Sequence, residues 1–90
     1  DLALLQDLYT EDATDTHGTD FSGTASEYLT FIESCQPFMP YSGHHVCNHL
    51  VSVAGDEAKG EVYVLGLQCI GAPGGPLVED WHVMRYMDDY

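Results

Sequence analysis

The pattern of apolar and polar positions divides the chain into a helical first part and a strand-rich second part. Leucine and tyrosine side chains recur at helical spacing over residues 1–9, where Asp1 is placed to cap the helix. Thr24 and Glu27 match a capping box, and an apolar stripe follows them. We therefore predict a second helix over residues 24–36, which ends where prolines begin.

Strand-like alternation fills most of the remaining sequence. Residues 13–17 are predicted to form a short strand with Asp15 and His17 on one face, and residues 21–23 a loop. Glycine-rich turns then separate three long predicted strands, over residues 42–53, 58–70 and 77–90. Helices followed by a meander of strands predict an α+β fold, a curved antiparallel sheet with the helix over residues 24–36 against its concave face.

Three of the five histidines, His44, His45 and His49, lie within ten residues at the start of the first long strand. On a regular strand His45 and His49 share a face about 13 Å apart, too far to chelate one metal, and His44 points to the other face. On a helix His45 and His49 would be neighbours able to bind zinc, but the flanking valines favour a strand. We expect His45 and His49 on the outer face and His44 in a pocket, where histidine suits proton transfer.

Charge excludes several partners. The chain has fifteen acidic residues and only two basic ones, Lys59 and Arg85, so the net charge is −13. Such a surface repels phosphate backbones and anionic membranes, so we expect neither nucleic acid nor membrane as a partner. No apolar run in the sequence is long enough to span a bilayer. Ninety residues with 44% hydrophobic side chains indicate one globular domain.

The number and spacing of the cysteines indicate the cellular compartment of the protein. Cys35, Cys47 and Cys69 are odd in number and have no C-x-x-C spacing. This pattern predicts reduced, mostly buried thiols in a cytoplasmic protein.

Four short motifs together resemble a known family. They are Leu8-Tyr9-Thr10-Glu11-Asp12-Ala13, Asp15-x-His17-Gly18, His44-His45-Val46-Cys47-Asn48 and Arg85-Tyr86-Met87-Asp88. Their order and spacing resemble the SnoaL-like branch of the nuclear-transport-factor-2-like superfamily. The resemblance implies a cone, in which a bent sheet wraps around helices and encloses a ligand cavity. It also implies a single domain over residues 1–90, a fragment that lacks the first helix and last strand of the family.

The resemblance also implies a site. In the dehydratases and the dehydrochlorinase of this family, the first histidine of the central motif is the catalytic base, and His44 occupies that position. The family's orienting Asp and assisting Arg would fall outside the chain, so we assign the orienting role to Asp15. The implied wall of the ligand cavity comprises His17, Met39, Val62, Val64, His82, Met84 and Tyr86. Alternation independently puts His82, Met84 and Tyr86 on one face.

These features favour a lyase or isomerase that needs no cofactor and no metal. Dehydratase-type elimination or proton transfer on a hydrophobic ring compound would use His44 as general base. Asp15, His17 and His82 make the pocket more polar than that of the dehydrochlorinase, which favours a hydroxylated or carbonyl-bearing substrate. Two alternatives stay open: a non-catalytic domain that binds an apolar small molecule, and a metal site formed across strands by His17, His44 and His82. Homo-oligomerisation through the sheet is a further expectation.

Overall fold

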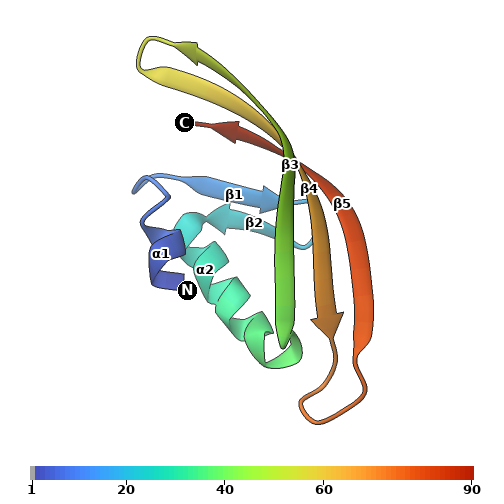
Figure 1. Ribbon diagram of the computed structural model, residues 1–90. Coiled ribbons are helices and arrows are strands. Elements are labelled where there is room, and N and C mark those ends of the chain that lie inside the picture. The colour runs from blue at the N-terminus through green and yellow to red at the C-terminus, as the bar shows by residue number, and fades with distance from the viewer. Residues whose placement is uncertain (1) are drawn as a thin grey trace. The chain divides into compact units, whose positions relative to one another are not determined.

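The computed structural model describes residues 2–90, so the expected cap at Asp1 lies outside the described residues. The chain forms two compact units, one up to Pro37 and one from Phe38 to Tyr90. The α+β class with antiparallel sheets is confirmed (Figure 1). The elements, in order, are α1 (Leu2–Gln6), β1 (Thr14–His17), β2 (Phe21–Thr24), α2 (Ala25–Cys35), the 3₁₀ helix η1 (Gln36–Phe38), β3 (Tyr41–Ala54), β4 (Glu57–Ile70) and β5 (Val78–Asp89).

The first unit contains two departures from the predicted elements. Helix α1 ends before residue 9 because the amides of Leu8 and Tyr9 bond to carbonyls three residues back, which tightens the chain into turns. Residues 21–23, predicted to be a loop, belong to β2 and pair with β1. A turn at Gly18, whose φ of 54° favours glycine, returns the chain so that the two short strands meet.

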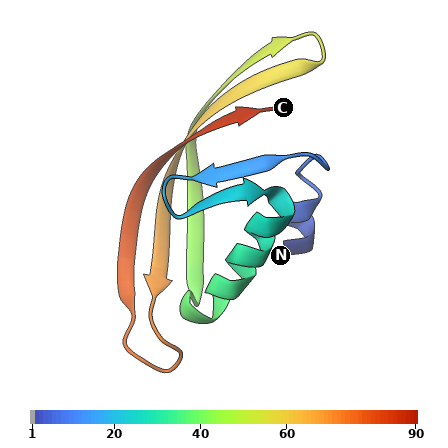
Figure 2. The ribbon, with the colours of Figure 1, turned by 180° about the vertical axis from the view of Figure 1, so that it is seen from behind.

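Helix α2 begins where the sequence predicted. The hydroxyl of Thr24 accepts the Glu27 amide at 3.3 Å, and the Glu27 carboxylate accepts the Thr24 amide at 2.8 Å, which completes a capping box. The ring of Tyr28 lies 5.2 Å from that of Phe21, and the ring of Phe31 lies 5.5 Å from it. These aromatic contacts hold α2 against the β1–β2 hairpin. Figure 2 shows the helix beside this hairpin from behind.

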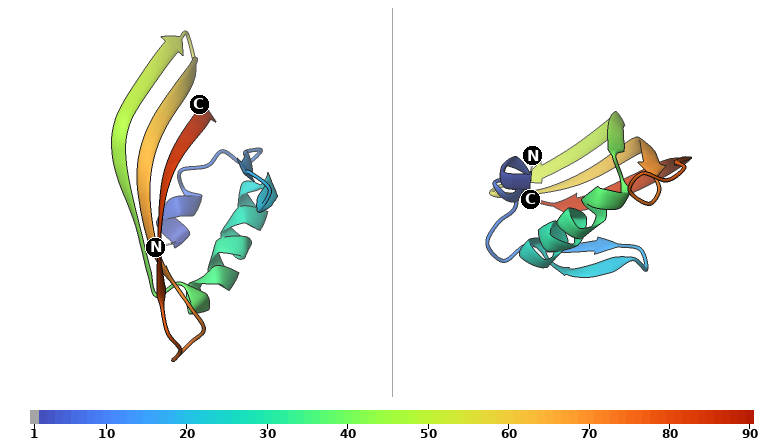
Figure 3. Two further views of the ribbon diagram at one scale, coloured as in Figure 1. Left: turned by 90° about the vertical axis from the view of Figure 1, so that its right-hand side faces the viewer. Right: turned by 90° about the horizontal axis from the view of Figure 1, so that it is seen from below.

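The second unit is a three-stranded antiparallel sheet in the order β3-β4-β5. Figure 3 shows that its long strands curve together along their length. The turn between β3 and β4 has two residues, and Gly55 occupies its first position with a φ of 65°, as a type II′ turn requires. The central strand carries the most buried side chains of this unit, Val62 and Val64, at 7% and 1% exposure.

Strand β3 contains a β-bulge that changes which side chains share a face. Val46 pairs with Val64 and His49 pairs with Val62, so three steps along β3 match two along β4. The extra residue reverses the alternation of β3 beyond the bulge. Strand residues directly opposite each other share a face. The prediction that His45 and His49 lie on one outer face is therefore wrong: His49 shares the face of His44, and His45 lies on the other.

The cysteines are free, but the prediction that most are buried is wrong. Cys35 and Cys69 are half-buried, and Cys47 is exposed. Cys47 lies at the bulge of β3, on a strand whose side chains are mostly exposed. Within residues 2–90, no helix combines the length and the apolar character needed to cross a membrane.

Candidate functional site

The face of the β3–β4–β5 sheet that carries His44 gathers most of the predicted site. His44 pairs with Gly66, and Gly66 pairs with His82, so the two histidines stand in one row on either side of a residue without a side chain. We call this side the histidine face. By register it carries His44, Val46, His49, Val62, Val64, Gly66, Asp80, His82, Met84 and Tyr86.

His44 contacts Tyr86 across the central strand. Its Nδ1 lies 3.5 Å from the Tyr86 hydroxyl oxygen, and the two ring centroids are 6.4 Å apart. The same hydroxyl donates to the sulfur of Met84 at 3.6 Å. Because His44 is on β3 and Tyr86 on β5, the tyrosine side chain reaches over β4, where Val62 and Val64 are buried. His44 and its contact with Tyr86 are exposed to solvent, and Val62 and Val64 are covered beneath them.

His82 is held by a carboxylate from its own strand. Its Nδ1 lies 3.2 Å from Oδ2 of Asp80, and the His82 side chain is 30% exposed. A Cβ placed on Gly66 would lie 2.8 Å from Cδ2 and 3.3 Å from Nε2 of His82, so the imidazole rests over Gly66. The edge of the His82 imidazole that carries Nε2 and Cδ2 thus lies over β4, on the side toward β3.

Asp15 and His17 form a separate cluster within the first unit. The Asp15 carboxylate accepts the Tyr9 hydroxyl at 2.6 Å and lies 2.9 Å from Nε2 of His17. The His17 ring stacks on Tyr28 with centroids 4.4 Å apart. Asp15 thus serves as the partner of His17 here, and its predicted role in orienting His44 stays a prediction. Met39, half-buried, lies in the second unit between η1 and β3.

Sequence reasoning missed two members of the histidine face. Asp80 was not singled out, although the spacing Asp80-x-His82 on a strand puts both side chains on one face and was readable from the sequence. His49 was assigned to the wrong face because no sequence signal marks the bulge. Both add polar groups beside the predicted pocket wall.

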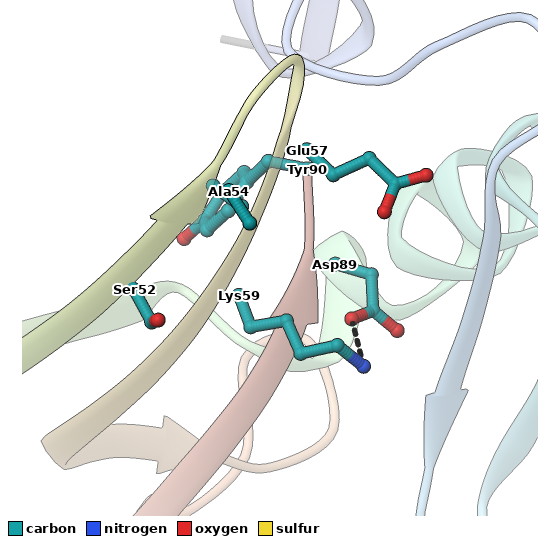
Figure 4. Close-up of a pocket in the computed structure, with 7 residues that line it drawn as sticks. Ser52, Ala54, Glu57, Lys59, Asp89 and Tyr90 are labelled. Carbon is teal, nitrogen blue, oxygen red and sulfur yellow. Dashed lines mark ion pairs between the residues drawn. The ribbon is translucent and has the colours of Figure 1, made fainter.

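The described residues also show a hollow away from the histidines. It has a volume of about 420 Å³ and lies by the turn between β3 and β4 (Figure 4). Its lining residues are Ser52, Ala54, Glu57, Ala58, Lys59, Asp89 and Tyr90. Lys59 and Asp89 pair there at 3.1 Å, yet their side chains are 82% and 80% exposed. We place the candidate site on the histidine face, because it brings His44, His82, Met84 and Tyr86 together, whereas the charged residues of the hollow pair with each other in solvent.

A metal site would need several ligating side chains close together. Among residues 2–90, no three His, Cys, Asp or Glu side chains gather closely enough to hold an ion. The contacts that the structure does show for His44 and His82 are to a phenol and a carboxylate. Such partners fix imidazole orientation and suit proton transfer.

The fold and the polar cluster are those of a domain that binds a small molecule or moves protons on one. The sequence model of the SnoaL-like domain family matches residues 1–90. The chain therefore belongs to the SnoaL-like domain family, within the nuclear-transport-factor-2-like superfamily, and the resemblance inferred from the sequence is confirmed. Comparison with curated proteins and with solved structures gave no match.

Proposed function

We propose that this SnoaL-like domain belongs to a cofactor-independent lyase or isomerase in which His44 is the general base. The reaction is a dehydratase-type elimination or a proton shift on a hydrophobic ring compound. The observation that carries the proposal is the contact of His44 Nδ1 with the Tyr86 hydroxyl, 3.5 Å away, on the face that also carries His82.

The Tyr86 hydroxyl contacts Nδ1 of His44 at 3.5 Å and the sulfur of Met84 at 3.6 Å, which supports a fixed orientation of the imidazole. The base mechanism uses the tautomer in which Nδ1–H of His44 points to the Tyr86 oxygen. In that tautomer Nε2 of His44 carries the lone pair. A base needs this arrangement, because an oriented imidazole whose Nε2 is the basic nitrogen can remove a proton from a carbon next to an activating group.

The composition of the face supports the class of substrate. Val62 and Val64, at 7% and 1% exposure, are covered, so the part of this face that a ring can contact includes His44, His82, Met84 and Tyr86. Histidine and tyrosine polar groups beside the apolar side chain of Met84 favour a ring compound with hydroxyl or carbonyl oxygens. The net charge of −13 disfavours an anionic substrate.

The alternative is a non-catalytic domain that binds an apolar small molecule. The half-buried side chains of Met84 and Tyr86 support it, because such a surface binds a ring without any proton transfer. Saturable binding of ring compounds with no turnover would favour this alternative. One metal per chain, lost in His44→Ala, would instead favour the cross-strand metal site of His17, His44 and His82.

The test is an assay of the full-length protein on hydroxylated and carbonyl-bearing ring compounds. We expect His44→Ala to lower the rate by ~10²–10⁴-fold, the usual contribution of a positioned general base. His45→Ala is the matched control, because His45 lies on the opposite face of the same strand. A fully active His44→Ala enzyme would remove the base assignment.

A further inference from the structure

The pair formed by Asp80 and His82 has no role in the base mechanism described above. Asp80 and His82 are two residues apart on β5 and share a face, and their side chains meet at 3.2 Å. This arrangement fixes the ring and leaves Nε2 as its reactive atom, because Nδ1 is engaged by the carboxylate. A histidine oriented in this way is suited to give or take a proton at one defined position.

We propose that His82, oriented by Asp80, is the general acid that protonates the leaving oxygen while His44 removes the proton from carbon. The inference rests on the proposed function and adds the second proton-transfer group that an elimination of water needs. Hydroxide is a poor leaving group, so departure of the oxygen requires a proton donor near it. When His82 carries a proton, its Nδ1–H remains paired with Asp80 and its Nε2–H faces the substrate.

The two histidines are far enough apart to reach the two bonds that break in the elimination, the C–H bond and the C–O bond. They stand on β3 and β5 with Gly66 between them, so their Cα atoms are about 9.6 Å apart, two strand spacings. Gly66 has no side chain, and the His82 ring and the Met84 methyl group occupy the space directly over it. In this proposal the substrate ring lies above these side chains, with a C–H toward His44 and a hydroxyl toward His82.

The step balances in protons and electrons. Nε2 of His44 takes the proton from carbon, and the electron pair of that C–H bond becomes the new C=C bond. The C–O bond breaks, and its electron pair leaves with the oxygen, which takes the Nε2 proton of His82 and departs as water. His44 ends protonated and His82 neutral, and exchange with solvent restores both.

No other described carboxylate stands beside His82 in the sheet register. On β4, Gly66 faces His82 and Gln68 faces Asp80, and on β3 the same two rows contain His44 and Ser42. The neighbours of His82 on its own strand, Trp81 and Val83, point to the opposite face. Asp80 is thus the positioning residue in this cluster.

The experiment compares two leaving groups on one ring in the full-length protein. The probes are a β-hydroxy cyclohexanone and its β-acetoxy analogue, because acetate leaves as a stable anion without a proton. We expect His82→Gln to slow loss of hydroxide by ~10²–10⁴-fold and to leave loss of acetate unchanged. His44→Ala should slow both. The control Asp89→Asn alters a carboxylate of the same strand that pairs with Lys59, and should slow neither.

Asp80 is tested by the same pair of leaving groups, and His82 also by the pH profile. A general acid must be protonated, so the wild-type rate with the hydroxyl probe should fall at high pH, and His82→Gln should lose that fall. Asp80→Asn should slow loss of hydroxide and leave loss of acetate unchanged, whereas Asp80→Glu should restore loss of hydroxide. A residue that only supports the fold would change the rates with both probes.

The outcomes separate the two proposals. Equal slowing of both leaving groups by His82→Gln, or no slowing of either, overturns the general-acid role while His44 keeps its own. Wild-type activity in His44→Ala, or no turnover of either probe by the wild type, overturns the proposed function and the inference with it. Circular dichroism of each variant establishes that it is folded.

Discussion

The imidazole of His44 and the phenol of Tyr86 meet across the central strand, with Nδ1 and the hydroxyl oxygen 3.5 Å apart. The two residues are 42 positions apart in the sequence, on strands that are not hydrogen-bonded to each other. Their contact needs Tyr86 to cover β4, and the small side chains Val62 and Val64 beneath it leave the room. The predictions below follow from this contact and from its neighbours.

Removal of the Tyr86 hydroxyl should weaken the base without loosening the sheet. We expect Tyr86→Phe to lower the rate roughly five- to tenfold, because a net hydrogen bond contributes about 1 kcal/mol. The ring stays over Val62 and Val64, so the denaturation midpoint should hardly move. Steady-state rates and urea unfolding of both proteins measure this. A rate loss as large as that of His44→Ala would show that Tyr86 itself carries a proton in the reaction.

A methyl group at Gly66 should affect activity more than stability. A Cβ there would lie 2.7 Å from Cε of Met84 and 2.8 Å from Cδ2 of His82. Side-chain ends rather than backbone must shift, so Gly66→Ala should fold while it displaces His82 from its position over the sheet. We expect a marked loss of rate with the hydroxyl probe and near-normal thermal unfolding.

Gly60 offers the matched control for this substitution. Gly60 lies on β4 like Gly66, but away from the histidines. A Cβ at Gly60 would lie 2.7 Å from Cε2 of Tyr90. Gly60→Ala should therefore disturb packing to a similar extent and leave the rate intact. Equal rates for Gly66→Ala and wild type would show that the position of His82 over Gly66 does not matter for turnover.

The capping box of α2 should give stability a dependence on acid pH. Hydrogen bonds from the amide and hydroxyl of Thr24 hold the pKa of Glu27 below its ordinary value of 4.5. The contribution of the carboxylate is therefore complete above that value and is lost as the pH falls through the lowered pKa. Thr24→Ala should cost about 1 kcal/mol of unfolding free energy, as N-cap losses do.

Urea unfolding at neutral pH and at acid pH checks the capping prediction. The difference between wild type and Glu27→Gln should shrink as the pH falls, since protonation removes the charged hydrogen-bond acceptor in the wild type. A difference that stays constant across that range would show that the carboxylate form of Glu27 does not stabilise the helix.

The face opposite the histidines should decide whether the chain self-associates. Trp81, Val83 and Met87 lie there with 56%, 77% and 66% exposure. Homo-oligomerisation through the sheet would bury these side chains, so we expect Trp81→Glu to shift the protein toward the monomer in light scattering. Leu8→Glu, at an 80% exposed apolar residue of the first unit, adds the same charge as a control. Equal masses for wild type and Trp81→Glu would exclude this face as the interface.

Local sequence signals predicted the elements whose causes are local. The capping box at Thr24 and Glu27 set the start of α2, and Gly55 set the turn between β3 and β4. The spacing of His82, Met84 and Tyr86 put them on one face because that strand is regular. Strand β2 was missed, since Phe21-Ser22-Gly23 gains strand structure only by pairing with β1.

The sequence by itself determined the α+β class, the family and the identity of the candidate base, because these depend on short-range periodicity and on motifs. Only the tertiary structure decided which histidines share a face. The extra residue of the β3 bulge reverses alternation, and that residue is specified by pairing with β4 rather than by β3 alone. Tertiary structure also decided the contact of His44 with Tyr86. The registers of β3 with β4 and of β4 with β5 bring these distant residues together over Val62 and Val64.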